Sequence, residues 1–360
     1  MCETAGNGHN GSARTIPVTE AIGMVLAHDI TEIRPGEFKG RAFKKGHVIK
    51  EEDICHLQRL GKEHLYVLDI KEDELHENDA AYQLARALMG DGVEMEGEPR
   101  EGKINIIASR DGLLKIDANK LLAFNMLGDV MCATLHNNSL VKKGQLVAGT
   151  RAIPLVVKKR LVQEAVKRAG GSVIQVKELR KPKAGVVITG NEVYYGRIKD
   201  AFKPIIERKI KAFGGEIVGV YYAPDDATYI ETRLRELLEA GADLLITTGG
   251  MSVDPDDVTR FAIRNLGVSE MHYGSAVLPG AMFLVAYIER PAINGQSPGV
   301  VPVLGIPACG MYHKTTIFDL ILPRVLAGER IGRKELAELG HGGLCLNCKE
   351  CRYPVCPFGK

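Results

Sequence analysis

The feature that most constrains the fold is the regular alternation of apolar and amphipathic segments that begins at residue 182. Short apolar runs have the length and the β-branched content of buried strands, and the segments between them have helical spacing of apolar side chains. In chain order, the predicted strands and helices are residues 184–189, 202–214, 216–222, 227–241, 243–248, 255–267, 282–289, 299–305 and 309–328. Strands that alternate with helices form a largely parallel sheet covered on both faces. Residues 182–330 are therefore predicted to be a three-layer αβα domain of the α/β class.

The chain before this domain has a different pattern. Residues 14–97 combine strand-like runs with a helical segment at 76–90, which predicts a mixed α/β region. Residues 98–181 contain short apolar runs separated by turn residues, which is typical of a small β-rich domain, a barrel or hybrid sandwich, closed by a connecting helix. The polar, Gly-rich residues 1–13 are predicted to be a flexible leader.

The charge balance and hydropathy limit the function. The chain has 47 Lys and Arg against 45 Asp and Glu, a formal net charge of +2, whereas a nucleic-acid-binding protein needs a stronger basic field. No apolar run approaches the roughly 18 residues of a membrane span. The N-terminus also lacks the apolar stretch of a signal peptide. We therefore expect a cytoplasmic protein without nucleic-acid or membrane partners.

Chemistry-bearing residues gather in the loops that follow the predicted strands. In a doubly wound sheet, ligands bind beyond the carboxyl ends of the strands. Four such loops contain unusual sequences, at residues 189–200, 224–226, 247–257 and 305–310. In the third loop, Gly249 and Gly250 allow backbone N–H groups to face a ligand, and the helix that follows presents its positive end. Hydroxyls of Thr248 and Ser252 could add contacts, so this loop predicts an anion site, although the sequence lacks a P-loop motif.

Four carboxylates are predicted at the rim of this anion site: Glu192, Asp200, Asp226 and Asp257. Since phosphate and carboxylate repel one another, Mg²⁺ between them would explain their proximity. Carboxylates could also accept hydrogen bonds from the N–H donors of a heterocyclic ligand.

Structural roles are open for several of the same acids. Asp254, before a proline, fits an N-cap, and Asp256 and Asp257 fit the first turn of a helix. Asp225 and Asp226 fit a simple turn.

Residues 182–328 resemble the molybdopterin-binding domain shared by molybdopterin adenylyltransferases and molybdopterin molybdotransferases. Six motifs carry the resemblance: TGNEV (189–193), GRIKD (196–200), PDD (224–226), TTGGMSVDPDD (247–257), VLPG (277–280) and GIPACG (305–310). The third-loop turn is also similar to that of the nicotinamide-nucleotide amidase relatives, and residues 15–70 weakly resemble the start of the molybdotransferase N-terminal region. The resemblance implies an αβα domain that binds molybdopterin, the pterin-phosphate part of the molybdenum cofactor, at the strand ends.

The candidate site follows from these loops and motifs. The candidate cofactor-binding residues are Thr189, Gly190, Glu192, Asp200, Thr248, Gly249, Gly250, Ser252 and Pro307, and the candidate catalytic residues are Asp226 and Asp257. The sequence departs from the family at Ala201-Phe202 and at 305–310, and it lacks the family's N-terminal DGYA-type segment.

Half of the eight cysteines lie in the last sixteen residues, as Cys345, Cys348, Cys351 and Cys356. Four thiolates at this spacing can ligate zinc or an iron–sulfur cluster, and a reduced tail without metal is the alternative. Residues 331–360 are predicted to be a separate cysteine-rich tail, so a chain cut after Gly340 should keep its fold. Cys309 could touch the ligand or be a small buried thiol.

Three functions are compatible with these features. The first is a Mg²⁺-assisted transferase of molybdenum cofactor biosynthesis, resembling the molybdotransferases or adenylyltransferases. The second is a non-catalytic cofactor carrier, sensor or insertion partner, whose protein partner would be a molybdoenzyme or another protein of the cofactor pathway. The third is a nucleotide-pyrophosphatase-like hydrolase. A homo-oligomer is compatible with each.

Overall fold

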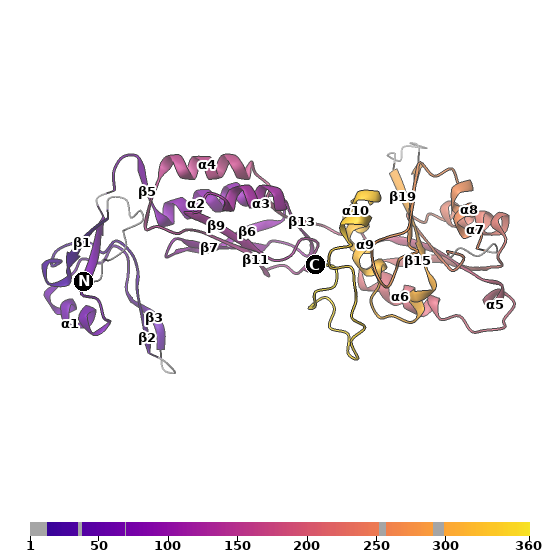
Figure 1. The fold of residues 1–360 in the computed structure, drawn as a ribbon, viewed down its shortest axis with the longest axis horizontal. Helices are drawn as coiled ribbons and strands as arrows, with labels where there is room; N and C mark the ends of the chain where they lie inside the picture. The colour runs from indigo at the N-terminus through magenta and orange to yellow at the C-terminus, as the bar shows by residue number, and fades with distance from the viewer. Residues whose placement is uncertain (1–12, 35–37, 69, 252–256, 291–298) are drawn as a thin grey trace, which may run out of the picture. The chain divides into compact units, whose positions relative to one another are not determined.

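The computed structural model of this chain describes residues 13–34, 38–68, 70–251, 257–290 and 299–360. Residues 1–12 of the predicted leader and the predicted site residue Ser252 lie outside the described residues, as do Asp254 and Asp256. The chain divides into two compact units, Met1–Lys177 (unit 1) and Glu178–Lys360 (unit 2) (Figure 1). In the described part of the chain, no helix is long and apolar enough to cross a membrane.

The first part of unit 1 is a small α/β structure with its own core. Its elements are β1 (Ala13–Pro17), η1 (Val18–Glu20), β2 (Ile30–Arg34), β3 (Phe38–Phe43), α1 (Glu51–Arg59) and β4 (His64–Leu68). β1 pairs antiparallel with β4, and β2 with β3. Leu57 of α1 and Ile16 of β1 meet in a compact apolar cluster.

The second part of unit 1 contains three small sheets and three helices. The strands are β5 (Glu74–His76), β6 (Val93–Arg100), β7 (Lys103–Ala108), β8 (Gly112–Ile116), β9 (Val130–Thr134), β10 (Leu140–Val141), β11 (Leu146–Ala152), β12 (Val156–Lys158) and β13 (Ile174–Lys177). The helices are α2 (Glu77–Leu88), α3 (Ala118–Asn125) and α4 (Lys159–Ala169). The sheets have the orders β6-β7-β11-β9 and β10-β8-β13, and β5 pairs with β12. These strands pair antiparallel with one another.

Helix α2 shows how this core forms. Its apolar residues recur at helical spacing, so Ala81, Leu84 and Leu88 lie on one face and are fully buried. The side chain of His76 accepts a hydrogen bond from the Asn78 N–H and caps the first turn. The sequence-based boundary between residues 97 and 98 falls inside β6, which pairs with β7.

Unit 2 is built on one six-stranded sheet with the order β15-β14-β16-β19-β18-β17. The strands are β14 (Lys183–Thr189), β15 (Glu216–Ala223), β16 (Leu244–Thr248), β17 (Glu270–Tyr273), β18 (Leu284–Arg290) and β19 (Gly299–Ile306). β15, β14, β16 and β19 are mutually parallel, whereas β18 runs antiparallel to both of its neighbours. The sequence pattern predicted the strands at 282–289 and 299–305 but not β17, in which Glu270 is exposed and the other three residues are only partly buried.

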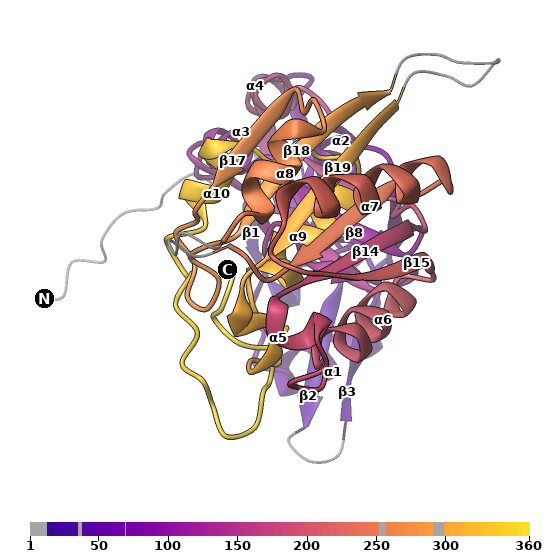
Figure 2. The same cartoon turned by 90° about the vertical axis from the view of Figure 1, so that its right-hand side faces the viewer.

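Helices cover both faces of this sheet, which gives the predicted three-layer αβα arrangement (Figure 2). The helical elements are α5 (Asn191–Tyr194), α6 (Phe202–Ala212), α7 (Ala227–Glu239), α8 (Thr259–Asn265), η2 (Ala308–Met311), α9 (Ile317–Leu326) and α10 (Arg333–Glu338). α6, α9 and α10 pack on one face and α7 and α8 on the other. Successive strand residues supply both cores: Val186 and Ile188 face the first, and Val187 faces the second.

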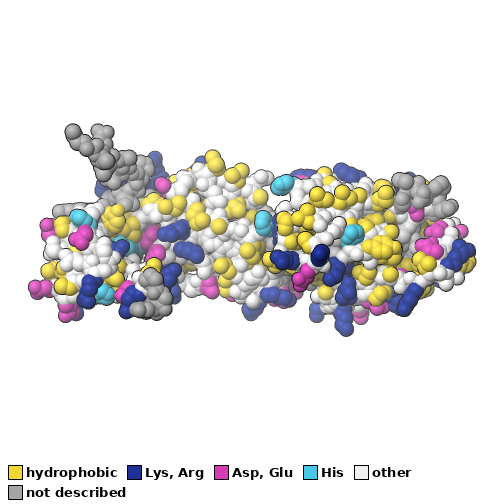
Figure 3. Space-filling model, turned by 60° about the horizontal axis from the view of Figure 1, so that its bottom comes forward, with side chains coloured by type: hydrophobic (Ala, Val, Ile, Leu, Met, Phe, Trp, Pro, Cys, Tyr) yellow, Lys and Arg dark blue, Asp and Glu magenta, His cyan; other side chains and the backbone are white. Residues whose placement is uncertain are grey.

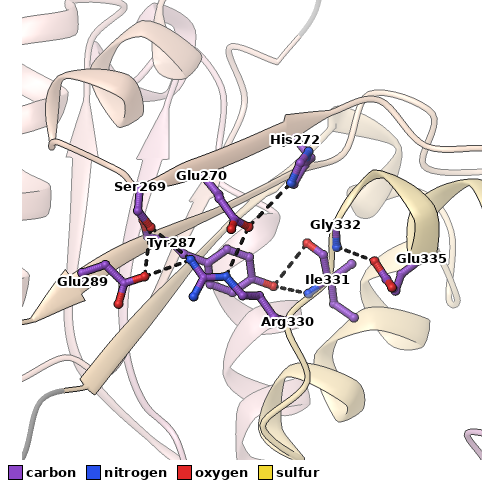
Figure 4. Close-up of polar contacts among 9 residues, drawn as sticks. All are labelled: Ser269, Glu270, His272, Tyr287, Glu289, Arg330, Ile331, Gly332 and Glu335. Atoms are coloured by element: carbon purple, nitrogen blue, oxygen red, sulfur yellow. Dashed lines mark hydrogen bonds and ion pairs between the residues drawn. The ribbon is translucent and has the colours of Figure 1, made fainter.

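The C-terminal segment, residues 329–360, is part of unit 2. The sequence had predicted a separate tail for residues 331–360. The N–H of Ile331 donates to the Tyr287 hydroxyl, and Arg330 binds Glu289 on β18 and Glu270 on the edge strand β17 (Figure 4). Phe358 is 3% exposed and packs in the same apolar cluster as α6 and α9. These contacts could not be predicted from the polar composition of residues 329–343. The buried side chains of Ile331 and Leu336 are isolated among polar residues and form no apolar run.

Candidate functional site

A cavity of about 570 Å³ lies where the carboxyl ends of β14, β16 and β19 meet. Because these strands are parallel and adjacent, their following loops emerge at one edge of the sheet. The cavity, called here the strand-end cavity, is lined by seven of the predicted cofactor-binding residues and one predicted catalytic residue: Thr189, Gly190, Glu192, Asp200, Gly249, Gly250, Pro307 and Asp257.

Gly249 and Gly250 form a tight turn against β14. Both have positive φ, +78° and +57°, a region that favours glycine. A Cβ on Gly249 would lie 2.5 Å from the Thr189 carbonyl oxygen, and one on Gly250 would lie 2.2 Å from the Thr259 hydroxyl. The absence of side chains therefore lets the backbone of this loop approach β14 and line the cavity directly.

Buried polar atoms surround this turn. The hydroxyl of Thr189 donates to the Thr248 carbonyl oxygen at 2.8 Å and lies 3.0 Å from the Thr259 hydroxyl. Asp257 lines the cavity, and its Oδ2 is buried without a hydrogen-bond partner among the described residues. A buried carboxylate oxygen without a partner is costly unless a ligand or ion satisfies it. This oxygen therefore indicates a ligand with a donor group or a cation.

Thr248, a predicted cofactor-binding residue, does not line the cavity. It is fully buried at the end of β16, and its hydroxyl has no hydrogen-bond partner in the part of the chain that is described. Successive side chains of a strand point to opposite faces, and Thr248 points into the domain.

Three other carboxylates line the cavity, and two of them accept hydrogen bonds from backbone N–H groups. Asp200 accepts hydrogen bonds from the N–H groups of Phe202 and Lys203, so it caps the start of α6. Asp225 accepts from the N–H of Asn191 at 3.0 Å and thereby ties the second loop to the first. Glu192 is exposed on α5.

The two neighbouring acids of the second loop have different roles. Asp226 is the N-cap of α7 and accepts from the Tyr229 N–H at 2.7 Å. Asp225, which the sequence analysis treated only as a turn residue, lines the cavity instead. The predicted catalytic residue Asp226 is therefore placed in a capping role, and the start of α7 at Ala227 decides which acid faces the cavity.

The apolar wall of the cavity was not predicted from sequence. Leu278, Met282 and Ile198 line it and are 56%, 38% and 51% exposed, unusually high values for large apolar side chains in a folded unit. Lys199 is a cation among the described residues that line the cavity. Leu278 belongs to the VLPG motif, so the sequence could have indicated this residue as part of the site.

Cys309 also lines the cavity beside Pro307. Burial raises the pKa of the Cys309 thiol, which favours its neutral form. The Cys309 side chain is half-buried. This position is compatible with both roles that the sequence left open, a small buried thiol and a ligand contact.

The four C-terminal cysteines lie apart from the strand-end cavity and line a second hollow in unit 2. No group of three or more His, Cys, Asp or Glu side chains within the described ranges is arranged to hold a metal ion. This holds for the tail thiols and for the carboxylates of the strand-end cavity.

An open α/β sheet with a glycine turn and acidic loops around a cavity at its carboxyl edge has the architecture of a ligand-binding αβα domain. Residues 185–327 match the family described as a probable molybdopterin binding domain, so this part of the chain is a domain of that family. Residues 15–69 match a domain of unknown function (DUF8806).

Similar proteins cover only part of the chain. A CinA-like protein of Mycobacterium avium (strain 104) is 39% identical over 225 residues, which are 49% of this chain and 51% of that protein. The chain thus spans about half the length of this relative. The structure of CinA from Thermoplasma acidophilum, a protein described as having unknown function, is 18% identical and covers 37% of this chain and 94% of its own, with a TM-score of 0.30. The tungsten cofactor synthesizing protein MoaB from Pyrococcus furiosus is 22% identical and covers 42% of this chain and 98% of its own, with a TM-score of 0.31.

Proposed function

We propose that the strand-end cavity of unit 2 binds molybdopterin, with its phosphate at the Gly249–Gly250 turn. The observation that carries this proposal is the pairing of a glycine turn that admits no side chain with the unpartnered buried oxygen of Asp257. A phosphate at the turn would accept hydrogen bonds from backbone N–H groups, and Lys199 would add a positive charge.

The remainder of the cavity suits a pterin ring. Leu278, Met282 and Ile198 provide an apolar wall for a flat heterocycle, and ligand pockets typically combine such a wall with a few polar groups. Asp225 and Glu192 would accept hydrogen bonds from the ring N–H groups.

Mg²⁺ is proposed between the phosphate and Asp257. Mg²⁺ is typically held by one or two carboxylates together with substrate phosphates and water, so it needs no preformed group of three acids. The unpartnered Oδ2 of Asp257 fits this role, because a cation would satisfy it and would offset its repulsion of the phosphate.

We further propose that the domain acts in molybdenum cofactor biosynthesis, as a transferase resembling the molybdotransferases or adenylyltransferases. Positioning and charge stabilisation by Asp257 and the glycine turn would be its contributions to catalysis. A carrier that holds the cofactor without turnover would use the same contacts. The Ala308-Cys309 sequence beside Pro307 favours the carrier, because it replaces the family's pattern at the cavity.

Anaerobic titration of molybdopterin into the full chain, followed by pterin fluorescence, tests the binding proposal. Asp257→Asn should weaken affinity at least about tenfold, or about 1.4 kcal/mol. The matched control is Asp226→Asn, because Asn is also a good N-cap and this residue does not line the cavity. Equal affinities of the two variants would place the ligand elsewhere.

Turnover separates the enzyme from the carrier. The full chain is incubated with molybdopterin, ATP and Mg²⁺, and pyrophosphate release is measured; molybdate is then supplied in a second reaction. Product formation that Asp257→Asn abolishes supports a transferase. Tight binding without either product supports a carrier, and hydrolysis of added nucleotide pyrophosphates without pterin affinity supports the hydrolase alternative.

A further inference from the structure

We propose that Cys345, Cys348, Cys351 and Cys356 form a thiolate metal centre, which takes zinc or an iron–sulfur cluster. The centre is separate from the strand-end cavity and does not depend on the function proposed for it. The spacing of the cysteines suggested a metal in a free tail, whereas the structure places the cysteines against the folded core of unit 2.

All four cysteines line one hollow of about 270 Å³, called here the cysteine hollow. Cys345 and Cys356 pack against the apolar cluster that includes α6 and α9, so this side of the hollow is fixed by the core. Cys348 and Cys351 are exposed and face solvent. Residues that are distant in sequence, among them Tyr312 and Thr315, complete the lining.

The segment that carries the cysteines is anchored at both ends and irregular between them. The N–H of Cys345 donates to the Leu278 carbonyl oxygen at 2.8 Å, and the N–H of Gly359 donates to the Gly342 carbonyl oxygen at 2.9 Å. Between these anchors, no described residue belongs to a helix or strand. The thiols are not gathered around one point. Because the cysteines are close in sequence, gathering them on a metal needs only local movement and little loop-closure entropy.

The charges around the hollow suit a centre with bound thiolates. Lys314, Lys349 and Arg352 line it, and no Asp or Glu is among the described residues that do so. Four thiolates on one zinc ion, or on one cubane cluster, leave a net negative charge that nearby cations offset. The Thr315 hydroxyl lies 3.3 Å from the Cys351 sulfur and can donate to a thiolate, as the groups around metal ligands commonly do.

The surface of the hollow is also unusually apolar. Tyr312, Leu344 and Leu346 line it and are 80%, 65% and 73% exposed. Figure 3 shows hydrophobic and basic side chains side by side on one face of unit 2. An apolar surround limits solvent access to a thiolate metal centre.

Two metals share this ligand chemistry. Zinc is bound tetrahedrally by four cysteines at short spacings. The run C-x2-C-x2-C with a later Cys-Pro is similar to the bacterial ferredoxin run but has one additional residue before its last cysteine. The metal content of the protein distinguishes the two.

The test uses the full chain, purified without oxygen and reconstituted separately with zinc and with iron plus sulfide. After gel filtration, we expect either about one zinc per chain, or about four irons with matching sulfide and a visible absorption band. The double variant Cys348→Ser, Cys351→Ser should lose this metal and keep its circular dichroism spectrum, because both side chains are exposed.

The matched control is Cys55→Ser, which removes an exposed cysteine of unit 1 and should retain the full metal content. The proposal is overturned if the wild-type chain holds no more metal than the double variant, with its C-terminal thiols free to titrate. Equal metal loss in Cys55→Ser would overturn it as well.

Discussion

The two units place their buried polar groups by different rules. In unit 2, parallel strands bring successive loops to one edge, so Asp200, Asp225 and Asp257 line one cavity although they are far apart in sequence. In unit 1, the sheets are small and antiparallel, so their loops leave in both directions. One of its buried acids, Glu77, instead lies at the start of α2. Polar sites can therefore be anticipated from strand ends in a parallel sheet and not in small antiparallel ones.

Glu77 shows what the second arrangement does to a carboxyl group. It is 5% exposed and lines a cavity with His28 and Arg151. Burial raises the pKa of Glu77 to about 7, although the positive charge of Arg151 opposes the shift. Burial also lowers the pKa of His28 and of His76. Burial in this part of unit 1 thus favours neutral forms, whereas in the strand-end cavity of unit 2 a buried carboxylate oxygen of Asp257 has no hydrogen-bond partner among the described residues.

The largest effect is expected from a change that tests where unit 2 ends. Phe358→Ala should destabilise unit 2 by about 3–5 kcal/mol, because it empties a buried aromatic site. Hydrogen exchange of the β14, β16 and β19 amides should accelerate while that of unit 1 is unchanged. Val355→Ala, at a side chain that is 85% exposed, is the control and should have almost no effect.

A chain cut after Gly340 loses Phe358 and should also lose the fold of unit 2, contrary to the expectation from sequence. Unchanged exchange in the truncated chain would show that the C-terminal segment is an independent tail after all.

The second prediction concerns the pH dependence of the stability of unit 1. The pKa of Glu77 is raised in the folded state, so the neutral form stabilises unit 1 fully below about pH 4.5, and this stability is lost as the pH rises to about 7. Glu77→Gln should remove this dependence and stabilise unit 1 above pH 7 by up to about 3 kcal/mol. Urea unfolding at several pH values, read from exchange of the α2 amides, is the measurement.

Glu94→Gln is the control for this pH series, since Glu94 is exposed on β6. Parallel pH profiles for the wild type and Glu77→Gln would mean that Glu77 ionises normally.

A third prediction concerns the glycine turn of unit 2. Gly250→Ala should cost about 1–3 kcal/mol more than Gly267→Ala. Both glycines have positive φ, so both variants strain the backbone, but only the Cβ on Gly250 meets other atoms within 4 Å. Thermal unfolding of the two variants measures the difference. Equal shifts would show that the close approach to Thr259 does not require a glycine at this position.

The smallest effect is expected at the α7 cap. Asp226→Ala should cost about 1 kcal/mol, the usual value of an N-cap, and should leave molybdopterin affinity unchanged. Exchange at the first turn of α7 reports the lost cap, and the titration reports affinity. A large loss of affinity with α7 intact would restore Asp226 to the site.

Much of unit 2 was predictable because its pattern is local. The strands β14, β15 and β16 are apolar runs between helices, and the glycine pair directly follows β16. In unit 1 the same method placed α2 but set a region boundary inside β6. The exposed side chains of β6, such as Glu94 and Glu96, conceal a strand that pairs on one edge. The short strand β17 was missed for a similar reason.

Sequence by itself determined the αβα periodicity of residues 182–330 and the placement of a glycine turn and acids at the strand ends, because those features depend on spacing along the chain. Tertiary structure alone decided which acid of the pair Asp225 and Asp226 faces the cavity, and that Thr248 points inward. It also decided that Glu77 is buried and that Phe358 joins the core. These outcomes depend on where a helix begins and on which distant side chains exclude water. Neither can be predicted from the neighbouring residues in the sequence.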